Sequence, residues 1–143
     1  KILTTTPGIE TAVGFSSAAE IDEINILRAT HRAMARAVSA LPGGLPDHAL
    51  VDGLPVKGLP CSSTAIVKGD AKSFLIAAGS ILAKVTRDHI MDEMDRLYPH
   101  YGFAKHKGYP TVEHLAALRE YGACPIHRHC YRPVADLDQP SLF

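Results

Sequence analysis

Two aspartates follow short apolar runs, at the points where strands would end. Asp52 comes directly after Leu50 and Val51, and Asp70 comes three residues after Val67. A carboxylate at the carboxyl end of a strand points into the crevice where open α/β sheets bind ligands. Two such carboxylates on neighbouring elements could hold a hard divalent cation, Mg²⁺ or Mn²⁺. An Asp-Gly turn and a helix N-cap are the plainer interpretation, which spacing alone favours.

Basic and hydroxyl side chains surround the second aspartate. Ammonium groups and a hydroxyl near a helix N-terminus can bind phosphate, whereas solvated surface lysine is the common alternative for any one of them. The candidates for phosphate contact are Lys68, Lys72, Ser73 and Lys84.

The segment from Lys105 to Tyr109 is a second candidate for nucleic-acid contact. It places Lys105, His106 and Lys107 beside the Tyr109 ring, with Gly108 allowing close approach of the backbone. Cations beside a stacking ring suit a nucleic-acid backbone and its sugars. A Gly-Tyr-Pro turn whose ring packs on the last helix explains the segment equally well.

Two further groups of chemical residues carry weaker signals. Cys124, His127, His129 and Cys130 form a spacing that matches no common structural zinc pattern, so a basic segment near a phosphate backbone is the better interpretation. The acidic pair at 22–23 falls in the first turn of a predicted helix, where it complements the helix dipole.

The elements that must position these residues follow a mixed α/β order. Short strands are expected over 11–16, 49–51 and 64–67, and a helix opened by the Ser17/Glu20 capping box is expected over 17–41. A second helical stretch from Phe74 ends before Tyr98-Pro99, and a last helix runs from Thr111 to Gly122. We therefore expect one α/β domain over 1–143, a mixed or parallel sheet with flanking helices, and a C-terminal tail over 136–143.

Composition excludes several classes of protein. The chain has 143 residues, of which 46% are hydrophobic and 21% charged, as in ordinary globular domains. Its longest uncharged apolar stretch, 74–83, falls short of the roughly 20 residues of a membrane span, so no membrane is expected. Lys and Arg equal Asp and Glu in number, but residues 101–135 carry five basic and two acidic side chains. This basic segment hints at a polyanionic partner. Three cysteines without a secretory signal favour a reducing compartment, the cytoplasm.

Several motifs in fixed order are similar to those of the ribonuclease HII family. The resemblance covers roughly residues 12–135. It rests on residues 21–27, 51–53, 68–73 (Lys-Gly-Asp-Ala-Lys-Ser), 77–88 (Ala-Ala-Gly-Ser-Ile-Leu-Ala-Lys-Val-Thr-Arg-Asp), 98–114 and 124–128.

The resemblance implies a ribonuclease H-like fold and an endonuclease. Its substrates would be the RNA strand of RNA/DNA hybrids and single ribonucleotides in duplex DNA, cleaved with Mn²⁺ or Mg²⁺ by two-metal hydrolysis. Asp52 and Asp70 match the third and fourth of the family's four carboxylates, and Tyr109 matches a ring that stacks on a sugar. Candidates for backbone contact are Lys68, Lys72, Ser73, Lys84, Lys105 and His106.

The sequence departs from the family at its N-terminal end. The family's Asp-Glu-Ala-Gly-Arg-Gly motif, which bears the first two carboxylates, is absent, and residues 1–11 match nothing in the family. We expect an N-terminally truncated domain that is inactive or weak, with a non-catalytic nucleic-acid-binding remnant as the alternative. A phosphatase or kinase lacks support, because no phosphate-cradling glycine loop is present. The oligomeric state stays open.

Overall fold

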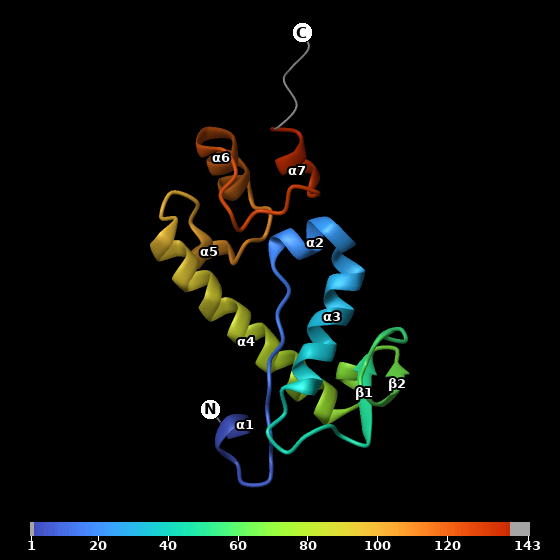
Figure 1. Cartoon of the computed structure of the whole chain (residues 1–143). Helices are drawn as coiled ribbons and strands as arrows, with labels where there is room; N and C mark the ends of the chain where they lie inside the picture. The colour runs from blue at the N-terminus through green and yellow to red at the C-terminus, as the bar shows by residue number, and fades with distance from the viewer. Residues whose placement is uncertain (1, 138–143) are drawn as a thin grey trace. The chain divides into compact units, whose positions relative to one another are not determined.

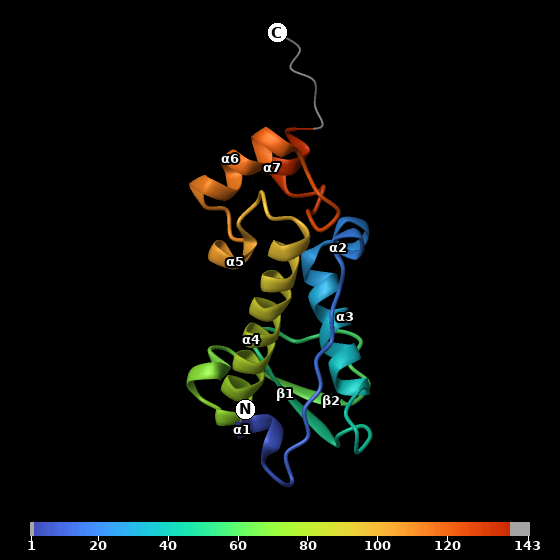
Figure 2. The ribbon, with the colours of Figure 1, turned by 90° about the vertical axis from the view of Figure 1, so that its left-hand side faces the viewer.

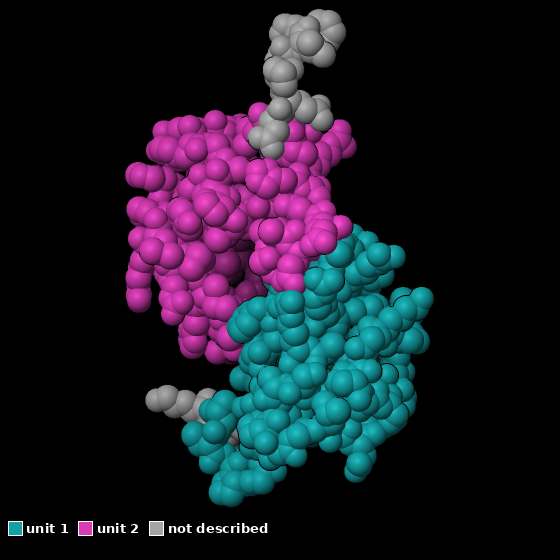
Figure 3. All heavy atoms as spheres, viewed as in Figure 1, with its two compact units in different colours: residues 1–16, 24–83 teal, residues 17–23, 84–143 magenta. Residues whose placement is uncertain are grey.

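The described part of the chain forms two compact units. The computed structural model describes residues 2–137. Unit 1 comprises residues 1–16 and 24–83, and unit 2 comprises residues 17–23 and 84–143 (Figure 3). The single domain expected from the sequence stays a prediction.

Helices predominate in both units (Figure 1). No helix within residues 2–137 is long and apolar enough to cross a membrane. The elements are α1 (Ile2–Thr5), α2 (Ala18–Ile24), α3 (Ile26–Ser39), β1 (His48–Asp52), β2 (Ser62–Ile66), the 3₁₀ turn η1 (Gly69–Ala71), α4 (Phe74–Leu97), α5 (Phe103–His106), α6 (Val112–Tyr121) and α7 (Arg132–Ala135).

The sheet of unit 1 consists of two parallel strands. The register pairs His48 with Ser62 at one end and Asp52 with Ile66 at the other. Both strands expected near 49–51 and 64–67 are therefore confirmed. Parallel pairing brings the carboxyl ends of β1 and β2 to the same edge, where the functional candidates of this unit lie.

The prediction of a strand over residues 11–16 is wrong. Residues 9–17 adopt no regular secondary structure and run alongside α3 (Figures 1 and 2). The Ser16 hydroxyl donates to the Ala29 carbonyl at 2.9 Å, and the Arg36 guanidinium donates to the Phe15 carbonyl at 2.6 Å. Contacts with a helix thus replace the ladder that a strand would need.

The prediction of a single helix over residues 17–41 is wrong in part, because the segment forms two helices, α2 and α3. Its opening is confirmed, because the Ser17 amide donates to the Glu20 carboxylate at 2.9 Å and the Glu20 amide donates to the Ser17 hydroxyl at 3.1 Å. Asn25 then takes a positive φ of 69° and interrupts the helix. Its side chain accepts from the Arg28 amide at 3.1 Å and starts α3 as an N-cap.

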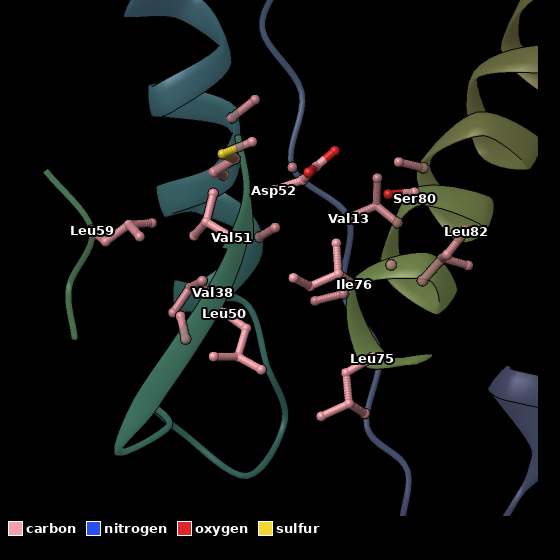
Figure 4. A pocket seen from close by; sticks show the side chains of 18 of the residues that line it. Val13, Val38, Leu50, Val51, Asp52, Leu59, Leu75, Ile76, Ser80 and Leu82 are labelled. Atoms are coloured by element: carbon pink, nitrogen blue, oxygen red, sulfur yellow. The ribbon is translucent and has the colours of Figure 1, made fainter. Parts of the chain in front are cut away.

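Unit 1 contains an apolar cavity of about 470 Å³ between residues 12–14, α3, β1 and the first turns of α4 (Figure 4). Val13, Val38, Val51 and Ile76 line it, and Asp52 is among the lining residues. The aliphatic faces of a helix, a strand and a second helix thus converge beside the Asp52 strand end.

The core of unit 2 is aromatic. Tyr101, Phe103 and Cys124 are buried, with Met91 and Met94 of α4 packed against them. The helix predicted from Thr111 to Gly122 is confirmed as α6: the Thr111 hydroxyl accepts from the His114 amide at 3.2 Å, and Gly122 ends the helix with a φ of 75°. The segment over 101–110, which precedes α6, contains the short helix α5.

The C-terminal segment is helical over α7, which the sequence patterns do not indicate. Of the tail expected over residues 136–143, residues 138–143 lie outside the described residues.

Candidate nucleic-acid and metal site

The first part of the candidate site is the joint edge of β1 and β2. Asp52 is the last residue of β1, and Gly53 turns the chain away with a φ of 85°. The Gly69 amide donates to Asp52 Oδ1 at 2.7 Å. Asp52 therefore holds the start of η1, and Asp70 is the residue next to its hydrogen-bond donor.

Asp70 is exposed on η1, and its Oδ1 accepts from the Ala71 amide at 2.9 Å. The structure thus brings Asp52 and the turn that bears Asp70 together at one edge of the sheet. Of the plainer interpretation, the helix N-cap is wrong for Asp70, because Asp70 lies inside η1, whose N-cap is Lys68, and accepts only from the adjacent amide.

Carboxylate oxygens are the donors that Mg²⁺ and Mn²⁺ prefer, and Mg²⁺ is commonly held by one or two carboxylates together with waters and substrate phosphates. The Asp52 and Asp70 pair fits that chemistry. Among residues 2–137, no group of three or more His, Cys, Asp or Glu side chains could hold a metal ion.

Three more candidates belong to the same turn. Lys68 precedes η1 with a left-handed φ of 55°, and Lys72 follows it; both side chains are exposed. Ser73 is half-buried, and its amide donates to the Gly69 carbonyl at 2.7 Å. The turn over 68–73 therefore gathers two cations, a hydroxyl and the Asp70 carboxylate.

The remaining candidates lie in unit 2. Tyr109 is exposed over 60% of its surface, and the Arg87 guanidinium carbon lies 5.0 Å from its ring centroid. Lys105 pairs with Glu113 at 2.5 Å, and Lys84 pairs with Asp88 at 2.7 Å. The hydrogen bond from Lys84 lowers the pKa of Asp88, and the Asp88 carboxylate raises the pKa of Lys84.

His106 differs from the other unit 2 candidates because it is buried. It is only 6% exposed, its Nε2 donates to the Tyr101 carbonyl at 2.8 Å, and its Nδ1 accepts from the Gly108 amide at 3.2 Å. Both ring nitrogens are therefore engaged within the chain, and its predicted contact with nucleic acid stays a prediction.

Sequence patterns did not single out Arg87 as a residue of this surface, whereas Lys107 was part of the predicted segment. Arg87 stacks over the Tyr109 ring, and Lys107 pairs with Asp92 of α4. Arg87 lies within the motif over 77–88, and its proximity to Tyr109 depends on how α4 meets the loop.

The segment from Cys124 to Cys130 has a buried half and an exposed half. Cys124 and His127 are buried, whereas His129 and Cys130 are exposed and donate their amides to Asp22.

Comparison with known proteins decides the family. The family model described as Ribonuclease HII matches residues 4–134. This chain belongs to the ribonuclease HII family.

Curated ribonucleases HII share more than half of the aligned residues with this chain. The protein of Magnetococcus marinus is 58% identical over 130 residues, which are 90% of this chain and 61% of that relative. The protein of Polynucleobacter necessarius is 54% identical over 125 residues, 85% of this chain and 64% of the relative. The protein of Geobacillus thermodenitrificans is 56% identical over 126 residues, which are 87% of this chain and 47% of that relative. The chain thus spans about half to two thirds of the length of these relatives.

The fold is also similar to a solved structure. The crystal structure of the ribonuclease H2 from Pyrococcus horikoshii OT3 matches with a TM-score of 0.65 at 24% identity, covering 85% of this chain and 65% of that one. This likeness supports the expected ribonuclease H-like α/β fold, with its small parallel sheet and flanking helices.

Proposed function

We propose that this chain carries part of the site of an endonuclease that cleaves the RNA strand of RNA/DNA hybrids and single ribonucleotides in duplex DNA, by two-metal hydrolysis with Mn²⁺ or Mg²⁺. Membership of a family of ribonucleases supports the reaction class. Three free cysteines suit a reducing compartment, and we place the protein in the cytoplasm.

The observation that carries the proposal is the Asp52 carboxylate, which ends β1 and accepts the amide that precedes Asp70. In this arrangement Asp52 and Asp70 are the metal ligands and catalytic carboxylates. A bound divalent cation would supply Lewis-acid stabilisation of the charge that develops on the phosphate oxygens. The protein's part is to fix Asp52 through the Gly69 amide and to leave Asp70 exposed toward substrate.

The turn over 68–73 would hold the phosphate backbone beside these carboxylates. Lys68 and Lys72 would act as mobile point charges, and the Ser73 hydroxyl would donate a directed hydrogen bond. Like charges on Asp70 and the phosphate repel, so neighbouring ammonium groups are needed for substrate to approach.

In unit 2, Tyr109 would stack on a sugar or base, because its ring is mostly exposed and Arg87 adds a cation over it. Lys84 and Lys105 would contact phosphates after breaking their ion pairs with Asp88 and Glu113 respectively, because ion pairs at the surface are weak. His106 would contribute from below the surface, by holding the backbone of this segment.

A second candidate function is nucleic-acid binding without cleavage. It is favoured by one observation: the described residues place two carboxylates at this edge and no third metal-binding side chain with them. Salt-sensitive binding of a duplex, independent of Mn²⁺, is what this alternative expects.

Cleavage of a labelled DNA duplex that contains one ribonucleotide tests the proposal, with Mn²⁺ present. The proteins compared are this chain, the chain extended by an N-terminal Asp-Glu-Ala-Gly-Arg-Gly strand, and Asp52→Asn in both. Asp47→Asn is the matched control, because Asp47 directly precedes β1 and its backbone carbonyl accepts from the Ser62 hydroxyl.

We expect the extended chain to cut on the 5′ side of the ribonucleotide, Asp52→Asn to abolish the cut and Asp47→Asn to preserve it. The unextended chain should be inactive or much slower. A folded extended chain that binds the duplex without cutting it would instead support the binding-only function.

A further inference from the structure

A buried chain of hydrogen bonds crosses unit 2 and ends on the backbone of Tyr109. The Cys124 amide donates to His127 Nδ1 at 3.0 Å, His127 Nε2 lies 3.1 Å from His114 Nε2, and His114 Nδ1 lies 3.0 Å from the Tyr109 carbonyl oxygen. His114 and His127 are 7% and 8% exposed. We call this series, from Cys124 through the two rings to Tyr109, the histidine chain.

Only one placement of protons satisfies the histidine chain. A carbonyl oxygen can only accept, so His114 Nδ1 carries a hydrogen and its Nε2 has a free lone pair. His127 Nδ1 accepts from an amide, so its hydrogen is on Nε2 and donates to His114. The two rings are therefore neutral and hold opposite tautomers.

A third histidine supports the same backbone. The His106 ring stacks on the His114 ring at 4.3 Å between centroids. Its Nδ1 accepts from the Gly108 amide, and its carbonyl accepts from the Tyr109 amide at 2.8 Å. The amide of Tyr109 is thus bonded to His106 and its carbonyl to His114.

The backbone that these bonds hold is an unfavourable one. Lys107 and Gly108 both have left-handed φ values, 50° and 77°. A non-glycine residue in that region persists only where its surroundings fix it. Beyond this segment the Tyr109 ring projects with 60% of its surface exposed, so its direction depends on the backbone below it.

We propose that His114 and His127 are positioning residues: through the histidine chain they fix the backbone of Tyr109 so that its exposed ring can receive nucleic acid. The inference deepens the proposed function and rests on it for the identity of the ligand. The arrangement requires both rings to be neutral, because a proton added to His114 Nε2 would face the Nε2 hydrogen of His127.

The groups around the two rings also disfavour that proton. Burial is the main cause that lowers the pKa of His114 and of His127, and the electrostatic effect of the neighbouring histidine, His106 or His114 respectively, adds to it. Other titratable groups facing the rings are Cys124, with Sγ 3.1 Å from His127 Nδ1, and Tyr101, with its ring 5.1 Å from that of His127. Also nearby on these segments are Glu113, which pairs with Lys105, and the His129 imidazole.

The first test reads the protons directly. Long-range ¹H–¹⁵N spectra of the ¹⁵N-labelled 143-residue chain at pH 7.5 should show the Nδ1–H tautomer for His114 and the Nε2–H tautomer for His127 and His106. Any other pair of tautomers for His114 and His127, or a charged ring in either, overturns the proposal, whatever the chain binds.

The second test is a double-mutant cycle, read as affinity for an RNA/DNA hybrid without a divalent cation. His114→Gln removes the Nδ1 donor and should weaken binding about fivefold, the value of one hydrogen bond. His114→Asn, which can place an amide N–H where Nδ1 lies, should recover most of the affinity. In a Tyr109→Ala background, His114→Gln should have no further effect, and the exposed His89→Gln is the matched control.

Full additivity of His114→Gln and Tyr109→Ala would show that His114 does not act through Tyr109, and would overturn the proposal. If His114→Gln does not fold, the pH profile of the unaltered chain decides. Binding should weaken from pH 7.5 to 5.5, and less so in Tyr109→Ala. Histidines that simply gain charge would strengthen binding to a polyanion, so a stronger affinity at pH 5.5 contradicts the proposal.

The two tests separate this inference from the proposed function. A chain with the expected tautomers that binds no duplex refutes the proposed function, and with it the ligand assigned to Tyr109. A chain that binds the duplex but shows other tautomers leaves the proposed function in place and refutes the histidine chain.

Discussion

The Gly69 amide donates a 2.7 Å hydrogen bond to Asp52 Oδ1, and Gly69 is buried. This contact joins the end of β1 to η1, the turn that follows β2, through a side chain. It gives Asp52 a structural task, holding η1, in addition to its proposed role toward a cation. Substitutions can separate these two tasks, because one depends on an oxygen and the other on a charge.

Asp52→Asn should keep the stability of the fold, whereas Asp52→Leu should lower it. Asparagine retains an oxygen that accepts from Gly69, so the free energy of unfolding should stay within about 1 kcal/mol of the unaltered chain. Leucine leaves a buried amide without an acceptor and should cost about 1–3 kcal/mol. Urea unfolding measures both, and Asp47→Asn is the control. Equal stability of the Asn and Leu variants would show that the hydrogen bond contributes nothing.

Lys105→Gln should change binding of nucleic acid without changing stability. The pair with Glu113 is at the surface, so its loss should leave the melting temperature unaltered. A lost phosphate contact lowers the slope of log affinity against log salt by about 1. Titration of an RNA/DNA hybrid at several salt concentrations measures this slope, with the exposed Lys57→Gln as control. An unchanged slope would remove Lys105 from the interface.

Local signals in the sequence predict much of this fold. The Ser17/Glu20 capping box, the Thr111 cap and the Gly122 terminus of α6 are confirmed, because each is a contact between residues close in sequence. The end of β1 that bears Asp52 was also predictable, since an apolar run followed by Asp-Gly is a local pattern.

Contacts between distant residues could not be read from the sequence in the same way. Periodicity gave no sign that residues 11–16 lie along α3 without forming a strand, or that His114 and His127 meet 13 residues apart. Asn25 did carry a signal, because asparagine is a strong N-cap residue within the predicted helix. The position of residues 11–16 and the contact between His114 and His127 depend instead on tertiary packing, which local sequence patterns do not encode.

Asp22 illustrates the same point and gives a third prediction. Its carboxylate accepts from the amides of His129 and Cys130, each at 2.8 Å and more than 100 residues away. Asparagine has one acceptor oxygen, so Asp22→Asn should leave one amide unpaired and cost about 1 kcal/mol in a partly exposed site. Urea unfolding measures it, with the exposed Glu23→Gln as the matched control and no change expected there.

The pH dependence of this contact has a definite sign. A hydrogen bond from the Cys130 thiol, followed by the amides of Cys130 and His129, lowers the pKa of Asp22. A carboxyl group with a lowered pKa stabilises the fold above its unfolded value and loses that effect as pH falls through its folded value. The difference between Asp22→Asn and the unaltered chain should therefore shrink below about pH 4. A difference that is as large at about pH 3 as at about pH 6 contradicts this account.

The buried histidines predict a second loss of stability on acidification, which begins at a higher pH than that of Asp22. Burial lowers the pKa of His114 and His127, so the unfolded chain takes up protons before the folded one. Their contribution is complete above about pH 6.5, the ordinary histidine value, and declines as pH falls toward their lowered folded values. Urea midpoints at pH 7.5 and 5.5 should show the decline. His114→Gln should reduce it, and His89→Gln should leave it unchanged.

Two glycines predict opposite effects of the same substitution. A Cβ on Gly14 would lie 2.6 Å from the Ala37 amide nitrogen and closer still to the Ala33 carbonyl oxygen. Both are backbone atoms of α3, which cannot move without breaking the helix, so Gly14→Ala should cost about 2 kcal/mol or more. A Cβ on Gly79 meets nothing within 4 Å. Gly79 lies inside α4, where alanine is the better helix former, so Gly79→Ala should add about 0.5–1 kcal/mol.

Urea unfolding of the two variants tests the close approach of residues 12–14 to α3. If Gly14→Ala is as stable as the unaltered chain, that segment does not pack on the helix, and the cavity that it borders beside Asp52 has a different wall. Gly79→Ala is the control for a general effect of an added methyl group, because Gly79 lines the same cavity and its substitution should change stability in the opposite direction.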